Sequence, residues 1–505
     1  MNQLIPLPIV LPLLAAALAS LFGRWKVVQR IISVAVLTAT SAISILLLVR
    51  VDRDGPLVMH AGDWRAPIGI TLVVDRLSAI MLTVASLMLL AVLVYAIGQP
   101  GAERHHVGFQ PVYMILAAGV AGSFLTGDLF NLFVSFEMML TASYVLLTLG
   151  GRKDQVRAGM TYVVISLLAS TLFITALALL YSATGTVNMA DLAAKIGQLP
   201  LGLRQAFAVL LVVVFGVKAA LFPLFSWLPD SYPVAPGPVT AVFAGLLTKV
   251  GVYALIRSQT LLFPEGSRPV TLLLITAGLT MAFGIIGAIA QDDVKRILSF
   301  NIVSHIGYMV FGLALFSVGG LAAAIFYAVH HIIAMTTLFL VDGLIEHVGG
   351  SSRMRELGNM VRSAPVVALL FLVPALGLAG IPPFSGFVPK LGLIQSGFAA
   401  VGGQGHRALV ISVVAVSLVV SLLTLFSVIK IWIGVFWSPA FETPSGAAHT
   451  VGRLGGPPLM VIPTATLFVL GLTVALTAGP LYRLCERAAS DLLNPHAYIT
   501  AVLGR

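Results

Sequence analysis

Blocks of about 20 consecutive apolar residues recur along almost the whole chain. A helix rises about 1.5 Å per residue, so such a block crosses a hydrocarbon layer about 30 Å thick. Lipid offers no partner for an open sheet edge, which favours helices as the spanning elements. The composition agrees, because 59% of the 505 residues are hydrophobic and only 10% are charged, with a mean hydropathy of +1.03. The sequence therefore predicts an all-α polytopic membrane protein.

The apolar blocks predict about fourteen transmembrane helices. They lie at residues 4–22, 31–49, 72–97, 110–126, 128–149, 157–182, 205–228, 234–257, 270–290, 296–317, 320–345, 364–398, 408–437 and 458–481. Residues 1–22 lack a basic leader and a clear cleavage site, so we expect a retained first helix rather than a signal peptide. The last 25 residues are predicted to form a short interfacial helix.

The charge and cysteine content narrow the possible functions. The net charge is +10, but the basic residues are spread through predicted loops without a basic run, which indicates contact with membrane lipid rather than nucleic acid. One cysteine, Cys485, excludes an intrachain disulfide and a cysteine-built metal site. The chain has no glycine-rich phosphate or dinucleotide motif. We expect no cofactor, metal or redox centre in this chain.

Two proline-rich stretches interrupt the apolar pattern, one after Lys218 and one before Lys390. The interrupted segments are predicted helices 7 and 12. They lie five helices apart, as in transporters built from inverted repeats. A packing kink is the alternative interpretation of each break. The lysine beside each break favours two inverted five-helix repeats, helices 4–8 and 9–13, with helices 7 and 12 broken.

This repeat pattern divides the chain into four parts. Residues 1–109 hold helices 1–3, residues 110–257 the first repeat, residues 258–437 the second repeat, and residues 438–505 helix 14 with a short C-terminal segment. Broken helices leave backbone groups free at membrane depth, where they can hold water or ions.

Several ionisable residues lie inside the predicted helices, where each costs roughly 2.5–3.5 kcal/mol unless it has a partner or a water-filled cavity. Glu137 lies mid-helix with Thr141 and Tyr144 at i+4 and i+7, which makes a narrow polar stripe. A structural carboxylate, permanently paired with a cation, is the alternative to a transport role for Glu137.

Three lysines accompany this carboxylate. Lys218 lies beside the first break, Lys249 in the next helix, and Lys390 at the end of the second broken segment. Desolvation brings the pKa of a lysine toward values that suit proton exchange. For each lysine, a side chain that reaches the membrane interface is the competing interpretation.

Three histidines complete the set of candidates. His330 and His331 are adjacent, so they point about 100° apart on a helix and at most one faces a given path. Tyr327 at i−3 and Thr337 at i+7 favour His330 slightly. For His305, as for His330, a histidine that is only hydrogen-bonded in the core is the alternative. Two further charges, Asp342 and Lys430, are predicted to be interfacial.

Together these residues could form a lateral chain at mid-membrane depth. Protons would pass between them through intervening waters, because the charge of each group shifts the proton affinity of its neighbours. A Glu137–Lys218 pair would act as the switch, holding both groups charged when together and releasing the lysine proton when apart.

Four motifs resemble the antiporter-like superfamily, which includes the Mrp antiporter large subunits and the proton-pumping membrane subunits of respiratory complex I. They are residues 127–137 (GDLFNLFVSFE), 248–254 (TKVGVYA), 293–299 (DVKRILS) and 380–387 (GIPPFSGF). The resemblance extends from helix 3 to helix 13. The chain length, residues 388–390 (VPK) and residues 430–437 (KIWIGVFW) are most similar to the D-type Mrp subunit.

The resemblance implies two inverted five-helix repeats with broken helices 7 and 12. It also implies a functional glutamate–lysine pair, a central lysine and a terminal lysine, which correspond to Glu137, Lys218, Lys249 and Lys390. Some relatives carry a lysine in helix 11 where this chain has Met335. The relay through that helix would then use His330, His331 or water.

Three functions follow as hypotheses. The first is proton transfer in a multi-subunit Na⁺(K⁺)/H⁺ antiporter of a bacterial plasma membrane, coupled to cation export, with a large A-type subunit and small membrane subunits as partners. The second is the proton-pumping membrane subunit of a complex I-like NADH–quinone oxidoreductase or a membrane-bound hydrogenase. The third is a structural subunit whose proton path is disabled. The first is a secondary transporter and not an enzyme, and the retained ionisable residues argue against the third.

Overall fold

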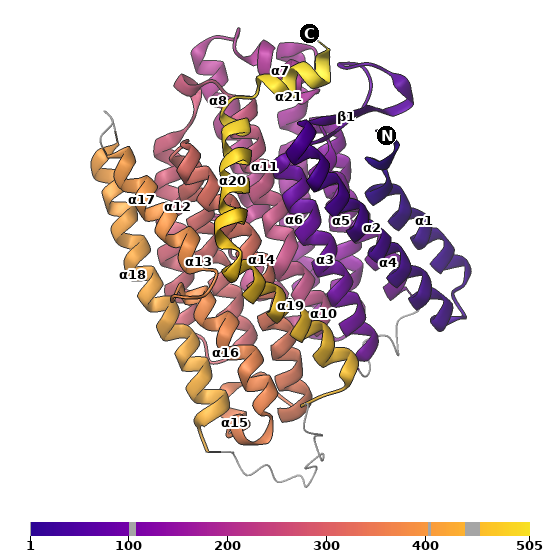
Figure 1. Ribbon diagram of the computed structural model, residues 1–505, viewed down its shortest axis with the longest axis vertical. Helices are drawn as coiled ribbons and strands as arrows, with labels where there is room; N and C mark the ends of the chain where they lie inside the picture. Colours follow the sequence, from indigo (N-terminus) through magenta and orange to yellow (C-terminus); the bar gives the residue numbers. More distant parts are fainter. Residues whose placement is uncertain (1, 100–107, 402–405, 440–454, 505) are drawn as a thin grey trace.

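The computed structural model describes residues 2–99, 108–401, 406–439 and 455–504. Its helices form one bundle, as Figure 1 shows. The N-terminal elements are α1 (Leu7–Leu21), α2 (Lys26–Asp54), β1 (Leu57–His60), β2 (Thr71–Val74) and α3 (Arg76–Gly98). The part predicted as the first repeat holds α4 (Phe109–Leu125), α5 (Leu129–Thr148), α6 (Lys153–Thr184), α7 (Met189–Ile196), α8 (Leu201–Ala219), α9 (Trp227–Ser231), α10 (Gly237–Val242) and α11 (Thr248–Leu261).

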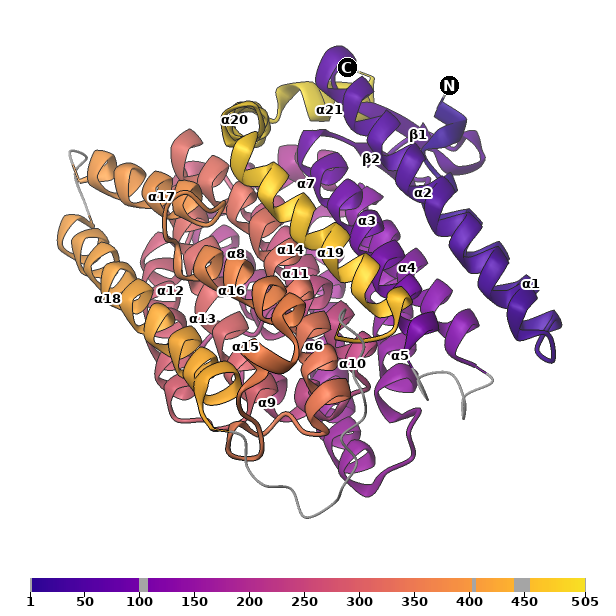
Figure 2. The same ribbon diagram turned by 60° about the horizontal axis from the view of Figure 1, so that its bottom comes forward.

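The part predicted as the second repeat holds α12 (Val270–Ile289), α13 (Val294–Ala314), α14 (Val318–Gly349), α15 (Met360–Ser363), α16 (Pro365–Ala379), α17 (Phe387–Ala400) and α18 (Arg407–Ile431). The C-terminal helices are α19 (Pro458–Leu476), α20 (Ala478–Leu493) and α21 (His496–Leu503). Figures 1 and 2 place α1 and α2 on one flank of the bundle and α18 on the opposite flank.

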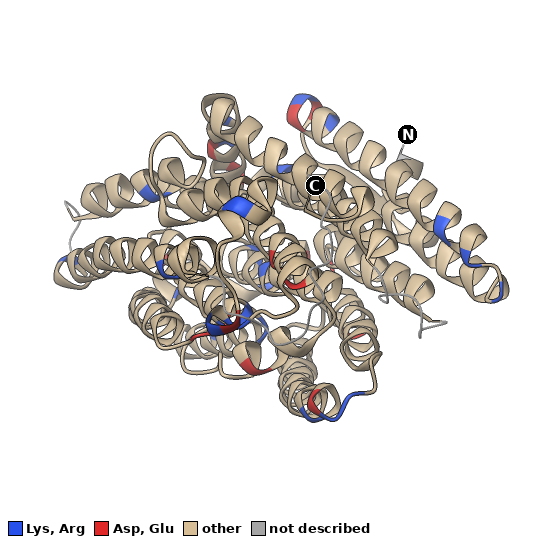
Figure 3. Ribbon diagram, turned by 90° about the horizontal axis from the view of Figure 1, so that it is seen from below, with Lys and Arg blue, Asp and Glu red and all other residues tan. Residues whose placement is uncertain are grey.

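Among the described residues, eleven helices are long and apolar enough to cross a membrane. Three shorter apolar helices, α1, α4 and α16, lie in other segments that the sequence predicted to span. Figure 3 shows a largely uncharged ribbon on which charged residues lie singly or in small groups. The polytopic α-helical fold is therefore confirmed, and the count of fourteen spans stays a prediction.

The structure differs from the predicted elements in three places. Residues 72–74, predicted as the start of the helix at 72–97, instead belong to strand β2, which pairs antiparallel with β1. The short helix α7 interrupts a segment predicted as a loop. Helix α20 runs along the bundle beside α14 instead of lying across its end, and only α21 lies across that end (Figure 1). Apolar length predicts none of these features, because each depends on contacts with other segments.

The two predicted repeats share a set of local features. Helices α6 and α14 both have 32 residues and end at a left-handed glycine, Gly185 or Gly350. Helices α5 and α13 both begin after an aspartate, Asp128 or Asp293, whose side chain accepts a hydrogen bond from the backbone N–H three residues later. Such caps satisfy N–H groups that the first helical turn leaves free.

The matched features lie at opposite ends of the bundle. Asp128 forms an isolated bridge with Asn188, just before α7, and Asp293 forms one with Arg353, which precedes α15. Figure 1 shows α7 at the top of the bundle and α15 at the bottom. Inverted repeats would place matched features at opposite ends in this way, and the division into two repeats stays a prediction.

Helix α14 lies in the interior of the bundle, where it packs against α3, α10, α13, α16, α17, α19 and α20. Its most apolar stretch is fully buried, as is that of the segment Gly237–Leu261. The second segment contains Lys249 and the first contains both adjacent histidines, so the fold places these groups in the protein interior and away from lipid.

Candidate functional site

Glu137 on α5 and Lys218 on α8 are joined by Ser170 on α6. The Ser170 hydroxyl donates a hydrogen bond to the Glu137 carboxylate and accepts one from Lys218 Nζ, 3.2 Å away. Lys218 Nζ also donates to the backbone carbonyl of Ser166 at 3.3 Å. A hydroxyl has one donor and two acceptor positions, so a single serine can bridge an acid and a base. The structure thus brings the predicted pair together through a residue that the sequence analysis missed.

The local fold positions Lys218 at the end of a helix. Helix α8 stops at Ala219, and Ala220 adopts a left-handed conformation with φ of 61°. A lysine in the last turn is favoured by the negative end of the helix dipole. Only 8% of Lys218 is exposed, whereas Glu137 is half-buried. Thr141, predicted to share a polar stripe with Glu137, is exposed instead.

Lys249 is completely buried in the first turn of α11. The preceding residues, Phe243–Leu247, form a π-helical turn, which joins α10 to α11. Lys249 Nζ donates a hydrogen bond to the carbonyl of Ala244 in this turn at 2.6 Å. A wide turn changes the pairing of backbone carbonyls inside a helix and is frequent at functional sites. Here it supplies an acceptor for a buried ammonium group.

Lys390 reaches back from α17 to the second break. Its Nζ donates to the carbonyls of Leu378 and Ala379 at 3.1 and 2.9 Å, at the C-terminal end of α16. The ammonium also lies 5.0 Å from the centre of the Tyr308 ring. Unpaired carbonyls at a helix end attract a cation, and so does an aromatic face. Lys390 is 6% exposed, so its side chain does not reach the surface of this chain.

Gly380 makes this arrangement possible. It ends α16 with φ of +84°, a conformation that glycine adopts without steric cost. A Cβ atom at this position would lie 2.6 Å from Cδ of Lys390. The break therefore needs glycine both for its backbone conformation and for the close approach of the lysine.

The histidines divide between two environments. His305 Nδ1 lies 2.7 Å from the hydroxyl of Tyr327, and its ring centre lies 5.2 Å from that of His331. His330 Nδ1 instead lies 2.8 Å from the hydroxyl of Ser385, in the second break. The adjacent histidines therefore point to different neighbours, as the helical geometry predicted.

All three histidines are buried, and within the described part of the chain they have ring nitrogens without a hydrogen-bond partner. These atoms are Nε2 of His305, Nε2 of His330 and both ring nitrogens of His331. Buried polar atoms are usually satisfied by protein or by water. His330 also lines a cavity with Thr337, Ser385 and apolar residues of α16 and α19. The unpaired nitrogens are positions that can accept or donate a proton.

A second cavity of about 20 Å³, enough for a water molecule, lies beside Lys218. Its lining includes Ser166, Leu247 and Gly251, so it reaches from the serine-bridged pair toward the turns that surround Lys249. The cavity thus connects the neighbourhoods of two of the predicted lysines.

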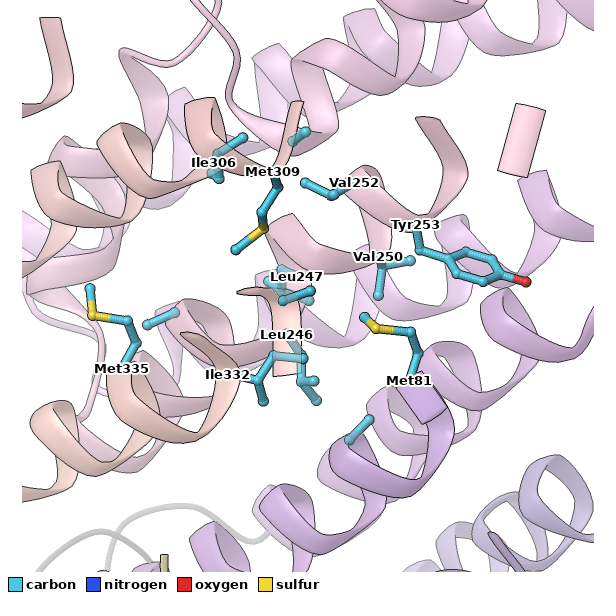
Figure 4. Close-up of a cluster of buried hydrophobic side chains, with 14 of the residues drawn as sticks. Met81, Leu246, Leu247, Val250, Val252, Tyr253, Ile306, Met309, Ile332 and Met335 are labelled. Atoms are coloured by element: carbon cyan, nitrogen blue, oxygen red, sulfur yellow. The ribbon is translucent and has the colours of Figure 1, made fainter. Parts of the chain in front are cut away.

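An apolar layer lies next to Lys249. Figure 4 shows Leu246 and Leu247 from the π-helical turn, Met309 from α13, and Ile332 and Met335 from α14 in one buried cluster. Met335 is the residue at which the resemblance implies a lysine in some relatives. The cluster thus lies beside the π-helical turn that precedes Lys249 and reaches α14, the helix that carries His330 and His331.

The ionisable side chains of the site are acids, amines and imidazoles, which are groups that can exchange protons. No group of three or more histidine, cysteine or acidic side chains suited to a metal ion is found among the described residues. The polar atoms instead form hydrogen-bonded pairs that reach from α5 to α17. Neighbouring groups of this kind change one another's proton affinity.

Asp342 is buried inside the protein, and its depth in the membrane stays a prediction. Asp342 was expected to be interfacial because it lies near the end of a predicted helix. Helix α14 continues to Gly349, and only 1% of Asp342 is exposed. Packing against other helices buries this aspartate, and apolar length alone does not reveal that packing.

Comparisons with known proteins point to one family, and the relatives named below are covered over their full length. Residues 126–419 match the family described as NADH:quinone oxidoreductase/Mrp antiporter, transmembrane. The D-type subunit of the Na⁺/H⁺ antiporter of Alkalihalophilus pseudofirmus is 43% identical over 505 residues, all of both chains. Among solved structures, a chain of the Mrp complex from a Dietzia species has a TM-score of 0.90 at 34% identity, with both chains fully covered. A chain of an archaeal membrane-bound sulfane sulfur reductase has a TM-score of 0.88 at 26% identity, also with full coverage.

Proposed function

We infer the function from the premise that this chain belongs to the NADH:quinone oxidoreductase/Mrp antiporter transmembrane family. We propose that it is the D-type subunit of a multi-subunit Na⁺(K⁺)/H⁺ antiporter. In this proposal the subunit passes protons along Glu137, Lys218, Lys249, the histidines and Lys390, and the complex couples this flow to export of a monovalent cation. The full-length likeness to the D-type subunit of a bacterial antiporter supports the choice within the family.

The serine-bridged pair of Glu137 and Lys218 is the observation that carries the proposal. A permanent structural ion pair would be expected to make direct charge-assisted contact. Here the shared hydroxyl of Ser170 is the contact, next to a cavity that can hold water. A small rotation of one serine side chain would break both hydrogen bonds at once. Such a junction suits groups that must associate and separate during each transport cycle.

The pair works as a switch in three steps. While Ser170 bridges it to Glu137, Lys218 is held in its charged form. When the bridge opens or Glu137 takes up a proton, the apolar surroundings favour the neutral amine. Lys218 then gives its proton to water in the adjoining cavity, from which Lys249 can receive it. Each transfer changes the charge that the next group experiences.

Lys390 occupies the far end of the proposed path. Its two carbonyl acceptors and the Tyr308 ring hold an ammonium group without a carboxylate. An ammonium that lacks a counter-ion can release its proton without breaking a salt bridge. His330, bonded to Ser385 in the same break, lies beside this terminal group and can exchange protons with it through water.

The proposal also includes the membrane and the partner subunits in which this chain would work. The subunit would work in a bacterial plasma membrane, together with a large A-type subunit and small membrane subunits. The solved Dietzia structure, whose matching chain is 34% identical to this one, is described as an Mrp complex, which supports a hetero-oligomer. Sodium or potassium would be the exported cation.

A second candidate function is that of a proton-pumping subunit in a respiratory complex. The full-length likeness to a subunit of an archaeal respiratory membrane complex favours it. The local proton chemistry would be the same, and only the partners would differ. Purification of the complex from its native membrane, with identification of its subunits, distinguishes the two functions, because a respiratory complex would contain redox subunits.

The test uses everted vesicles that contain the assembled complex. We expect Glu137→Ala and Lys218→Ala to abolish proton exchange driven by Na⁺ or K⁺, because each removes one side of the switch. Lys195→Ala is the matched control, because Lys195 pairs with Asp191 on the short helix α7, outside the path. Normal exchange by both variants in intact complexes would support a purely structural subunit instead.

A further inference from the structure

A second group of buried charges lies outside the proposed path, where α13 begins and α14 ends. Lys295 Nζ is 2.6 Å from Glu346 Oε1 and 3.9 Å from Asp342 Oδ2. The side-chain exposures fall from 30% for Glu346 through 9% for Lys295 to 1% for Asp342. The three groups thus form a graded series from the surface of the chain to its interior.

The carboxylate of Asp342 is unusual among the described residues. Both of its oxygens are buried, and neither has a hydrogen-bond partner. Lys295 forms its short hydrogen bond with Glu346 and not with Asp342. Burying a charge is costly unless hydrogen bonds compensate. A carboxyl in this position is suited to holding a proton, or a water that brings one.

The other charged and titratable groups that act on this carboxyl are few. Asp293 is engaged on both oxygens, one capping α13 and the other accepting from Ser352. Tyr95 on α3 donates its hydroxyl to the carbonyl of Leu340. Lys295 and Glu346 are therefore the groups with which Asp342 can exchange a proton.

The first half of the chain shows that the fold does not require these charges. Lys295 lies two residues after the cap Asp293, and Phe130 lies two residues after the matching cap Asp128. Asp342 lies eight residues before Gly350, and Leu177 lies eight residues before Gly185. Leu177 is buried, whereas Phe130 is 48% exposed, so the first half has apolar residues at both positions but packs only one of them in its interior. The charged group of the second half is therefore not a requirement of the helix framework that the two halves share.

The helix geometry connects this group to the histidines. His331, Met335, Leu338 and Asp342 follow one another at intervals of four, three and four residues, so they share one face of α14. Eleven residues of helix correspond to about 17 Å. Thr336 lies between His331 and Asp342 on α14, and Ser299 lies on α13, which packs against α14. Among the described residues, each has a buried hydroxyl without a hydrogen-bond partner. Waters held by these hydroxyls could carry a proton between Asp342 and His331.

We propose that Glu346, Lys295 and Asp342 form a proton-exchange site that connects His331 with the aqueous side at which α14 ends. In the inward direction, the Lys295 ammonium gives a proton to the Asp342 carboxylate, and the neutral amine then takes one from protonated Glu346. Glu346 then regains a proton from water, and Asp342 passes its proton toward His331. Each step moves one proton and breaks no other bond. This inference rests on the proposed function, since it assigns one end of the same path.

The test is Asp342→Asn, which keeps the shape of the side chain but cannot carry a proton. Because Asn cannot pass a proton onward, we expect cation-driven exchange by the assembled complex to fall about tenfold or more. Asp342→Glu should restore a substantial part of that rate, with a changed pH profile. The matched control is Glu356→Gln, which removes an exposed carboxylate at the same end of the bundle and should leave the rate unchanged.

The outcomes separate this inference from the proposed function. If Asp342→Asn exchanges protons at the normal rate while Lys218→Ala is inactive, the exchange site is wrong and the central path stands. If both variants are fully active, both proposals fail. Where Asp342→Asn does not assemble, the wild-type complex is treated with a hydrophobic carbodiimide, which attacks protonated buried carboxyls. Peptide mass spectrometry should find the adduct on Asp342, and its absence would overturn the inference.

Discussion

The hydroxyl of Ser170 is the smallest feature on which the proposed switch depends. It touches Glu137 and Lys218 at the same time, so its orientation determines whether the acid and the base communicate. Hydrogen bonds to charged groups contribute about 1.5–3 kcal/mol each. The position of one side chain can therefore change the balance between the charged and neutral forms of the pair.

Replacement of Ser170 tests this dependence. We expect Ser170→Ala to lower the rate of cation-driven proton exchange about tenfold, which corresponds to the loss of roughly 1.4 kcal/mol of coupling. The initial rate in everted vesicles is the measurement. Ser182→Ala, on the exposed face of the same helix, should have no effect. Equal rates for both variants would show that the bridge is dispensable.

Gly380 offers a second test at this scale. Ala at this position would adopt an unfavourable left-handed conformation at a cost of about 1–2 kcal/mol, and it would also displace Lys390. Gly350→Ala has the same backbone strain with open space around the new methyl group. We therefore expect both variants to melt at lower temperature and only Gly380→Ala to lose proton exchange. Loss of exchange in both would attribute the effect to strain alone.

The charged members of the site could be predicted because each interrupts an apolar block. Glu137 and Lys249 are conspicuous in the sequence for that reason alone. Ser170 could not be singled out in the same way, because isolated serines are tolerated in membrane helices at little cost. The nearest signal was the spacing of Ser166 and Ser170, which places two hydroxyls one turn apart on a single face.

At the scale of helices, small residues allow two neighbouring helices to approach each other most closely. Gly284 on α12 faces the backbone of Ser304 on α13, and a Cβ atom there would lie 2.4 Å from the Ser304 nitrogen. Membrane helices depend on such close packing, since lipid supplies little hydrophobic drive for association. The pairing of α12 with α13 fixes the position of His305, one residue beyond that contact.

This packing predicts a difference between two glycines of α12. Gly284→Ala should destabilise the protein by about 1–3 kcal/mol, because the helices must separate. Gly278→Ala should change stability by no more than about 0.5 kcal/mol, because its new methyl group would only touch Val413 at 3.5 Å. Thermal melting of the purified complex measures both. Similar melting temperatures would contradict the packing argument.

Helix positions follow from apolar length, whereas their interruptions depend on tertiary contacts. The predicted helix at 234–257 is found as Gly237–Leu261, but its π-helical turn was not predicted. Strand β2 replaces a predicted helical start because it pairs with β1. The breaks at Ala220 and Gly380 were predicted from proline, since proline removes a backbone donor and clashes with the preceding turn.

For the whole molecule, the two halves share their helix framework but differ in the charges they carry. The first half holds the serine-bridged pair, and the second holds the histidines, Lys390 and the group around Asp342. Lys249 follows the π-helical turn whose Leu246 and Leu247 belong to the apolar cluster of Figure 4. Because the two halves carry different charges, the proposed path would have two different ends.

Lys249 therefore provides the most direct test of the central claim that protons cross this chain through its buried ionisable groups. The measurement is cation-driven proton exchange by the purified complex in proteoliposomes, with Lys249→Met compared with Lys153→Met at an exposed helix start. Because Lys249 lies in the middle of the path, its removal should abolish exchange in a fully assembled complex, while Lys153→Met remains active. Wild-type exchange by an assembled Lys249→Met complex would contradict the account.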